Sequence, residues 1–153
     1  MVVQVFAVSI LSGLARAASR IDFGDRAITE EIQKGILVLI EPDVSVRDAL
    51  TLLLQSKGWE IRTAQSCREL SSAIGQGDLT AVVSESTLPD CTAQEILELC
   101  SAHNLPVVFT GHDLPLQGAV DLIRQGAMDF LDKPFPQARL LDLLERLSNR
   151  QNG

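Results

Sequence analysis

Two carboxylates, a hydroxyl and an amine follow short apolar segments of this sequence, at the point where each segment ends. They are Glu41, Glu85, Thr110 and Lys133. In an open α/β sheet, ligands and chemistry gather at the carboxyl ends of the strands, so these side chains are expected to share one pocket. Carboxylates in such a pocket could bind Mg²⁺, accept a phosphoryl group or form an ion pair with the amine.

The segments that position these residues alternate between strand and helix signals from Gly35 onward. Aliphatic runs such as 36–40 are too short for an independent helix and suit buried parallel strands. Asp43, Ser66 and Thr92 are expected N-caps, with Glu95 completing a capping box. We expect strands at 36–40, 59–64, 79–84, 106–110 and 128–131, and helices at 44–56, 66–74, from 92, 116–125 and 137–149.

Five βα units with right-handed crossovers predict an α/β fold, a (βα)5 three-layer sandwich with helices on both faces of a parallel sheet. The flavodoxin-like strand order 2-1-3-4-5 fits this pattern, with the less apolar second strand at an edge. The chain then divides into an N-terminal helical extension, residues 1–35, and a receiver-sized domain, residues 36–150.

The extension carries apolar residues at helical spacing from Val3 to Ile21, and a second short helix is expected at 27–34, before Gly35. This pattern favours an amphipathic helix that docks on the domain or on a second copy. A targeting segment is the alternative, because a small-residue stretch at 15–18 follows the apolar run. No basic residue precedes that run, however, and no apolar stretch reaches the length that spans a bilayer.

Charge and cysteine content exclude several classes of protein. The net charge of −7 lies in residues 36–153, without a basic stripe, which argues against direct nucleic-acid binding. Cys67, Cys91 and Cys100 have no metal-ligand spacing, and His103 and His112 are the two histidines. Free thiols in a reducing compartment, and therefore a cytoplasmic protein that does not enter a membrane, are the expectation.

Four ordered motifs carry a more specific signal. Residues 36–148 resemble the receiver domain of two-component response regulators, and the resemblance implies a signalling module rather than an enzyme. The motifs are Val46-Arg47-Asp48-Ala49-Leu50, Leu88-Pro89-Asp90, Val108-Phe109-Thr110-Gly111-His112, and Gly126-Ala127-Met128-Asp129-Phe130-Leu131-Asp132-Lys133-Pro134-Phe135.

The resemblance also implies a phosphorylation pocket in which two positions have changed. Receivers hold Mg²⁺ with two acids after the first strand and a phosphoacceptor aspartate after the third. Here Glu41 stands for the first acid, Pro42 for the second and Glu85 for the phosphoacceptor. Thr110 and Lys133 keep the family's residue types, and the lysine precedes a typically cis proline.

These changes predict that the pocket has lost its chemistry. Pro42 supplies no side-chain oxygen, and Asp43 is expected to cap the following helix instead of replacing it. The longer Glu85 displaces its carboxylate by about 1 Å, and a shift of that size costs roughly a hundredfold in an alignment-dependent reaction. We therefore expect no cofactor, with Mg²⁺ binding lost or weak. Any metal would use Glu41 and Glu85.

Two roles remain open for Glu85. It could imitate the phosphorylated state by reaching toward Lys133 and Thr110, or an ion pair with Lys133 could merely neutralise an inherited pocket. In the first case Thr110 leans toward the carboxylate, and Phe130, the family's switch aromatic, points inward. In the second case Phe130 is an ordinary packed strand residue.

The favoured function is an atypical receiver, or pseudo-receiver, that acts through protein contacts without phosphorylation. A histidine kinase or a downstream regulator is the expected kind of partner. A homodimer is expected through the face formed by the fourth helix, fifth strand and fifth helix of the domain, or through the N-terminal helix. The alternative is a phosphorylatable, magnesium-dependent receiver of a phosphorelay. A nucleotide-binding enzyme is disfavoured, because no glycine-rich loop follows the first strand. Whether the domain works in trans or belongs to a longer regulator stays open.

Overall fold

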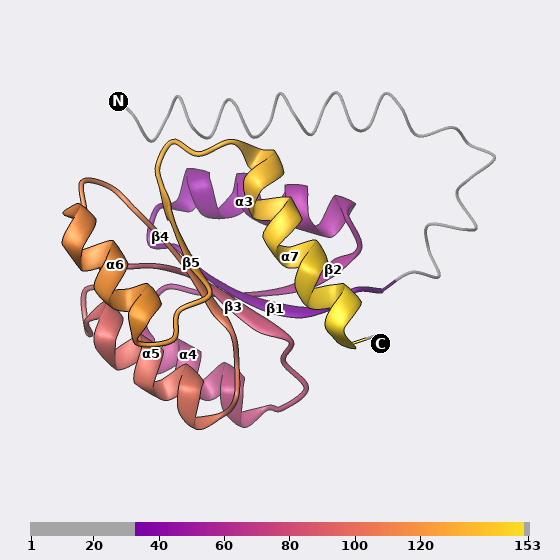
Figure 1. The fold of residues 1–153 in the computed structure, drawn as a ribbon. Helices are drawn as coiled ribbons and strands as arrows, with labels where there is room; N and C mark the ends of the chain where they lie inside the picture. Colours follow the sequence, from indigo (N-terminus) through magenta and orange to yellow (C-terminus); the bar gives the residue numbers. More distant parts are fainter. Residues whose placement is uncertain (1–32, 152–153) are drawn as a thin grey trace.

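The computed structural model describes residues 33–151 and contains one five-stranded parallel sheet (Figure 1). The strand order is β2-β1-β3-β4-β5, with β2 and β5 at the edges. This is the predicted flavodoxin-like order, with the less apolar second strand at an edge. The strands are β1 (Gly35–Ile40), β2 (Trp59–Ala64), β3 (Ala81–Glu85), β4 (Val107–Gly111) and β5 (Asp129–Asp132).

Five helices connect and follow the strands. In Figure 1, α3 and α7 cover one face of the sheet, and α4, α5 and α6 cover the other, so the three predicted layers are present. The helices are α3 (Val44–Ser56), α4 (Cys67–Gly75), α5 (Ala93–Ala102), α6 (Leu116–Arg124) and α7 (Gln137–Gln151). Among residues 33–151, no helix is long and apolar enough to cross a membrane.

The element boundaries differ from the predicted ones by one or two residues. Strand β3 begins at Ala81 rather than Leu79, because the chain still turns at Gly77 and Asp78, both of which have positive φ. The same strand runs on through Glu85, which pairs with Thr110 across the ladder. Gln33 and Lys34 are not helical, and the rest of the predicted N-terminal extension lies outside the described residues.

The predicted N-caps are confirmed at three helices. The Asp43 carboxylate accepts a hydrogen bond from the Val46 amide at 3.0 Å, and Ser66 caps α4 in the same way. Thr92 and Glu95 form the reciprocal capping box at the start of α5. Each cap satisfies amide groups that have no partner inside the helix.

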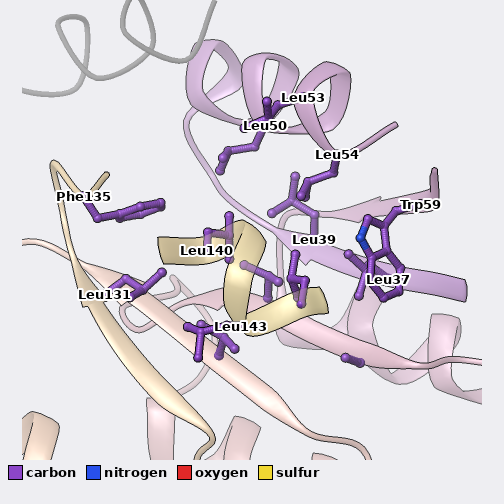
Figure 2. Close-up of a cluster of buried hydrophobic side chains, with 14 of the residues drawn as sticks. Leu37, Leu39, Leu50, Leu53, Leu54, Trp59, Leu131, Phe135, Leu140 and Leu143 are labelled. Atoms are coloured by element: carbon purple, nitrogen blue, oxygen red, sulfur yellow. The ribbon is translucent and has the colours of Figure 1, made fainter. Parts of the chain in front are cut away.

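A leucine-rich layer, called here the α3/α7 layer, fills the space between the sheet and helices α3 and α7 (Figure 2). Leu37 and Leu39 enter it from β1, because alternate residues of a strand point to the same face. In α7, Leu143 is buried with its neighbours, whereas Leu141 is only half-buried. The buried members are Leu37, Leu39, Val46, Ala49, Leu50, Leu53, Leu54, Trp59, Ala81, Val83, Val108, Leu131, Phe135, Leu140, Leu143, Leu144 and Leu147.

A second apolar layer, the α4–α6 layer, fills the opposite side of the sheet. Val38 and Ile40 enter it from β1, so both faces of that strand are covered, as its continuous aliphatic run predicts. The buried members are Val38, Ile40, Ala64, Leu70, Ile74, Val82, Leu88, Ile96, Leu97, Cys100, Val107, Phe109, Leu122, Ala127 and Phe130.

Candidate functional site

The four polar residues singled out from the sequence lie together at the carboxyl edge of the sheet. Glu41 directly follows β1, and Glu85 and Thr110 face each other in the β3–β4 register. Lys133 follows β5, and its backbone amide donates to the carbonyl of Gly111 at 2.8 Å. The Lys133–Pro134 peptide bond is cis, as the family resemblance implied. The parallel sheet therefore brings residues 92 positions apart in the sequence into one pocket.

The ammonium group of Lys133 binds both glutamates. Its Nζ lies 2.6 Å from Oε2 of Glu85 and also donates to Oε1 of Glu41. The side chains of Lys133, Glu41 and Glu85 are 1%, 5% and 10% exposed. One positive and two negative groups thus share a space that is largely closed to water.

Glu41 is held by two further groups. Its Oε2 accepts a hydrogen bond from the Asp43 amide at 3.2 Å, and Arg47 donates to its backbone carbonyl at 2.8 Å. Burial raises the pKa of Glu41, and the Glu85 carboxylate adds to this increase, while Lys133 acts in the opposite direction. Burial is the largest of these effects, because removal from water disfavours the charged carboxylate.

The neighbouring positions offer little to a cation. The side chain of Pro42 is exposed and has no oxygen. The Asp43 carboxylate caps α3, as predicted, and does not replace the missing acid. Over the described range 33–151, no group of three acidic, histidine or cysteine side chains is arranged to hold a metal ion.

Phe130 is buried and its ring approaches the pocket beside Gly111. A methyl group added to Gly111 would lie 3.2 Å from Cζ of Phe130, 3.3 Å from Oε1 of Glu85 and 2.5 Å from the hydroxyl oxygen of Ser86. The ring also belongs to the α4–α6 layer. Phe130 therefore occupies both of the environments that the sequence left open.

Thr110 is placed in the pocket but does not engage its carboxylates. The residue is 3% exposed and pairs with Glu85 through the backbone. Within the part of the chain that the structure describes, no hydrogen bond joins its hydroxyl to Glu41 or Glu85. Oε2 of Glu85 is bonded to Lys133 instead, so no hydrogen bond supports the lean of Thr110 that is expected if Glu85 imitates phosphate.

Two contacts of the site were not anticipated from the sequence. The sequence predicted an ion pair of Lys133 with Glu85 alone, whereas the ammonium group also holds Glu41. Arg47 was part of a motif, but its bond to the carbonyl of Glu41 was not expected. The sequence does contain a signal for the contact with Glu41. Lys133 follows a strand at the carboxyl edge of the sheet, and two glutamates stand at that same edge.

These features agree with a comparison of the sequence with known families. Residues 37–145 match the family model described as the response regulator receiver domain. The match spans well over half of the chain, so the protein belongs to this family of signalling modules. None of the curated protein sequences matches the chain.

Solved structures support the same fold. FixJ from B. japonicum is 29% identical with a TM-score of 0.70, and the match covers 78% of this chain and 60% of FixJ. NtrX from Brucella abortus in complex with ADP is also 29% identical, with a TM-score of 0.70, over 77% of this chain and 28% of NtrX. A two-component response regulator from Clostridium difficile, 21% identical, has a TM-score of 0.72 over 78% of this chain and 99% of its own.

Proposed function

We propose that this receiver is a phosphorylation-independent signalling and protein-interaction module rather than an enzyme. The observation that carries the proposal is the ammonium group of Lys133, which binds both Glu41 and Glu85 in a nearly closed pocket. In this arrangement Lys133 already neutralises the carboxylate that stands where receivers accept phosphate. The pocket is then held in one state by its own side chains.

The residues present do not fit a bound Mg²⁺. The ion requires near-octahedral oxygen ligands at about 2.0–2.1 Å, usually including one or two accurately placed carboxylates. Here Glu41 and Glu85 each give an oxygen to Lys133, Pro42 has none to give, and Asp43 is used by α3. A divalent cation would also meet the positive charge of Lys133 at the centre of the pocket.

Loss of the cation removes the main support for phosphoryl transfer to Glu85. Phosphoryl transfer is catalysed almost entirely by positioning and by neutralising charge on the transferred group. Oε2 of Glu85 is bonded to Lys133, and Oε1 lies in the crowded space beside Gly111 and Phe130. The bond to Lys133 therefore takes Oε2 of Glu85 away from in-line attack on a phosphodonor.

The pocket supports a partial imitation of the activated state. The buried ring of Phe130 is the feature expected of an activated receiver, and the Glu85–Lys133 pair places negative charge beside the Lys133 amine. The Thr110 hydroxyl does not take part. We infer that Glu85 acts through Lys133 and the position of Phe130, and that Thr110 is not its route.

An apolar stripe on α6 supports the protein-interaction part of the proposal. Leu116 and Ile123 are 81% and 43% exposed and lie two helical turns apart. Ala119 and Val120, half-buried, lie between them. The stripe belongs to the α6–β5–α7 face that the family resemblance named, and the 21%-identical NtrC4 receiver domain was solved as a beryllofluoride-activated dimer. A second copy or a partner regulator is the proposed occupant.

Exposure to a small phosphodonor tests the proposal directly. The intact protein is incubated with acetyl phosphate and Mg²⁺, and its mass is measured. We expect no phosphoryl group on Glu85. A single added phosphoryl group at that residue would establish the alternative, a phosphorylatable magnesium-dependent receiver.

A restored pocket supplies the positive control. The double variant Pro42→Asp/Glu85→Asp is expected to regain Mg²⁺ binding, measured by calorimetry, and to take up phosphate. A folded double variant that binds no metal would mean that Lys133 and Glu41, rather than the two substitutions, block the pocket.

The oligomeric state tests the surface. Light scattering of the full chain, and of a chain lacking residues 1–34, separates dimerisation through α6 from dimerisation through the extension. Ile123→Glu should convert an α6-mediated dimer to monomer, whereas truncation should do so if the extension forms the interface. A wild-type monomer at all concentrations would leave a different protein as the occupant.

A further inference from the structure

The loop after β3 is fastened to the start of α4 by one carboxylate. Oδ1 of Asp90 accepts a hydrogen bond from the Cys67 amide at 2.9 Å, and Oδ2 accepts one from the Arg68 amide at 3.1 Å. These bonds join segments 23 and 22 residues apart. They also lower the pKa of Asp90, so the carboxylate stays ionised at neutral pH.

These two hydrogen bonds, called here the Asp90 clamp, place two cysteines beside each other. Cys67 is the first residue of α4, and Cys91 directly follows Asp90. Both side chains are half-exposed, and both pack against the α4–α6 layer. A bridge between Thr87 and Thr92 closes the loop, so the backbone that carries Cys91 is fixed on both sides.

The Cys67 thiol lies close enough to Cys91 to affect the ionisation of Cys91. Burial raises the pKa of the Cys91 thiol to about 12, and a hydrogen bond with the Cys67 thiol is the next contribution. Cys100 also has its pKa raised to about 12 by burial and, less strongly, by Cys67. Cys67 is thus the shared neighbour, but Cys100 is fully buried on α5 and closed to a dissolved oxidant.

We propose that Cys67 and Cys91 form an oxidisable dithiol that becomes an intramolecular disulfide on exposure to a peroxide. The Cys67 sulfur attacks one peroxide oxygen, the O–O bond breaks, and a sulfenic acid and water are formed. The Cys91 sulfur then attacks the Cys67 sulfur, the S–O bond breaks, and the hydroxide leaves as water with the Cys91 proton. Two thiols are oxidised and one hydrogen peroxide is reduced to two waters.

The disulfide would tie the loop that follows Glu85 covalently to α4. This loop leads directly out of β3, so its first residues form one wall of the Lys133 pocket: Ser86 is buried and its hydroxyl approaches Gly111. The modification therefore gives a phosphorylation-independent receiver a chemical input at the same edge of the sheet. It does not depend on whether Glu85 accepts phosphate.

Mass spectrometry of the peroxide-treated full chain tests the proposal. After denaturation and alkylation, the labelled cysteines should fall from three to one. A cross-linked peptide pair containing Cys67 and Cys91, lighter by two hydrogen atoms, should appear and should vanish on reduction. Cys100→Ser should form the same cross-link, and Cys91→Ser should instead leave a sulfenic acid on Cys67 that dimedone traps.

Three outcomes would overturn the proposal: a disulfide to Cys100, a disulfide between two chains, or sulfinic acid without any disulfide. Asp90→Ala, checked for folding by circular dichroism, tests the geometry separately. It should slow cross-linking without changing the final product, because it releases the loop from α4. An unchanged rate would show that the clamp does not position the thiols.

Discussion

The Lys133 pocket lies at the carboxyl edge of the sheet and the α3/α7 layer lies on one of its faces, and the two stabilise the fold in different ways. In the α3/α7 layer, leucine side chains contribute roughly in proportion to the apolar area removed from water. In the pocket, three charges are removed from water, and their mutual attraction must first offset that desolvation. Figure 2 shows the leucine layer without a charged side chain among the residues drawn.

The two kinds of interaction indicate different roles for the α3/α7 layer and the Lys133 pocket. The leucine layer can be changed gradually, because its energy depends on volume and area. The pocket depends on the balance of its charges, so removing one member is costly and removing all of them is not. The Lys133 pocket lies at the carboxyl edge, where the family places its signalling chemistry, and its three charges cost free energy to remove from water. Such a group of charges is better explained by a role in specificity and signalling than by a contribution to stability.

Removal of the shared ammonium group should have the largest effect on stability. Lys133→Met leaves Glu41 and Glu85 buried without a cation, which should lower the free energy of unfolding by about 3–5 kcal/mol. Urea denaturation at neutral pH measures the change. The triple variant Lys133→Met/Glu41→Gln/Glu85→Gln should recover most of the loss. Equal destabilisation in both variants would show that packing, not charge, holds the pocket.

A truncation in the leucine layer comes next. Leu50 is 1% exposed, and Leu50→Ala should cost about 2–5 kcal/mol through lost burial and a residual cavity. Leu52, in the same helix and 49% exposed, is the matched control. Leu52→Ala should change the free energy of unfolding by less than about 0.5 kcal/mol. Similar losses at both positions would contradict the assigned orientation of α3.

Loss of the α3 cap should have an intermediate effect, and it sharpens the assignment of Asp43. Asp43→Ala should cost about 1 kcal/mol, because the Val46 amide loses its acceptor. Asp43→Ser keeps an acceptor oxygen without the carboxylate and should restore most of the stability in thermal denaturation. If Asp43 were instead a metal ligand, Mg²⁺ would stabilise the wild type and not Asp43→Ser.

The pH dependence of the unfolding free energy should show the smallest effect. The carboxylates of Glu41 and Asp90 should contribute to it with opposite signs. The pKa of Glu41 is raised above its ordinary value of 4.5, so the native state keeps a proton that the unfolded chain has lost. Its contribution to stability is present below the ordinary pKa and falls as pH rises through the native pKa. Glu41→Gln should remove this decline from a plot of unfolding free energy against pH.

Asp90 provides the opposite case. Its pKa is lowered from 3.8 by the amides of Cys67 and Arg68, so its contribution is present above that value and is lost as pH falls. Asp90→Asn should therefore flatten the curve at its acidic end, whereas Glu41→Gln acts at higher pH. If the two variants altered the curve in the same direction, the burial of Glu41 would not control its ionisation.

Much of the fold and part of the site could be predicted from the sequence. The aliphatic runs, the capping residues and the glycines each act over a few positions, so they specify elements without tertiary information. The motif around Leu88-Pro89-Asp90 and the Lys133-Pro134 pair then aligned the chain with a known pocket. The start of β3 was missed because Asp78, which is not a glycine, also takes a positive φ and extends the turn beyond Gly77.

The order of residues along the chain is enough to show which residue types stand at the carboxyl ends of the strands, and therefore that Pro42 and Glu85 replace the expected acids. Which of the two glutamates Lys133 binds depends on the folded arrangement of β1, β3 and β5, in which Lys133 binds both. The proximity of Cys67 to Cys91 also depends on the folded structure, because the Asp90 carboxylate binds the Cys67 amide. Local propensity follows from neighbouring residues, whereas the direction of a buried side chain depends on charges and packing contributed by distant strands and helices.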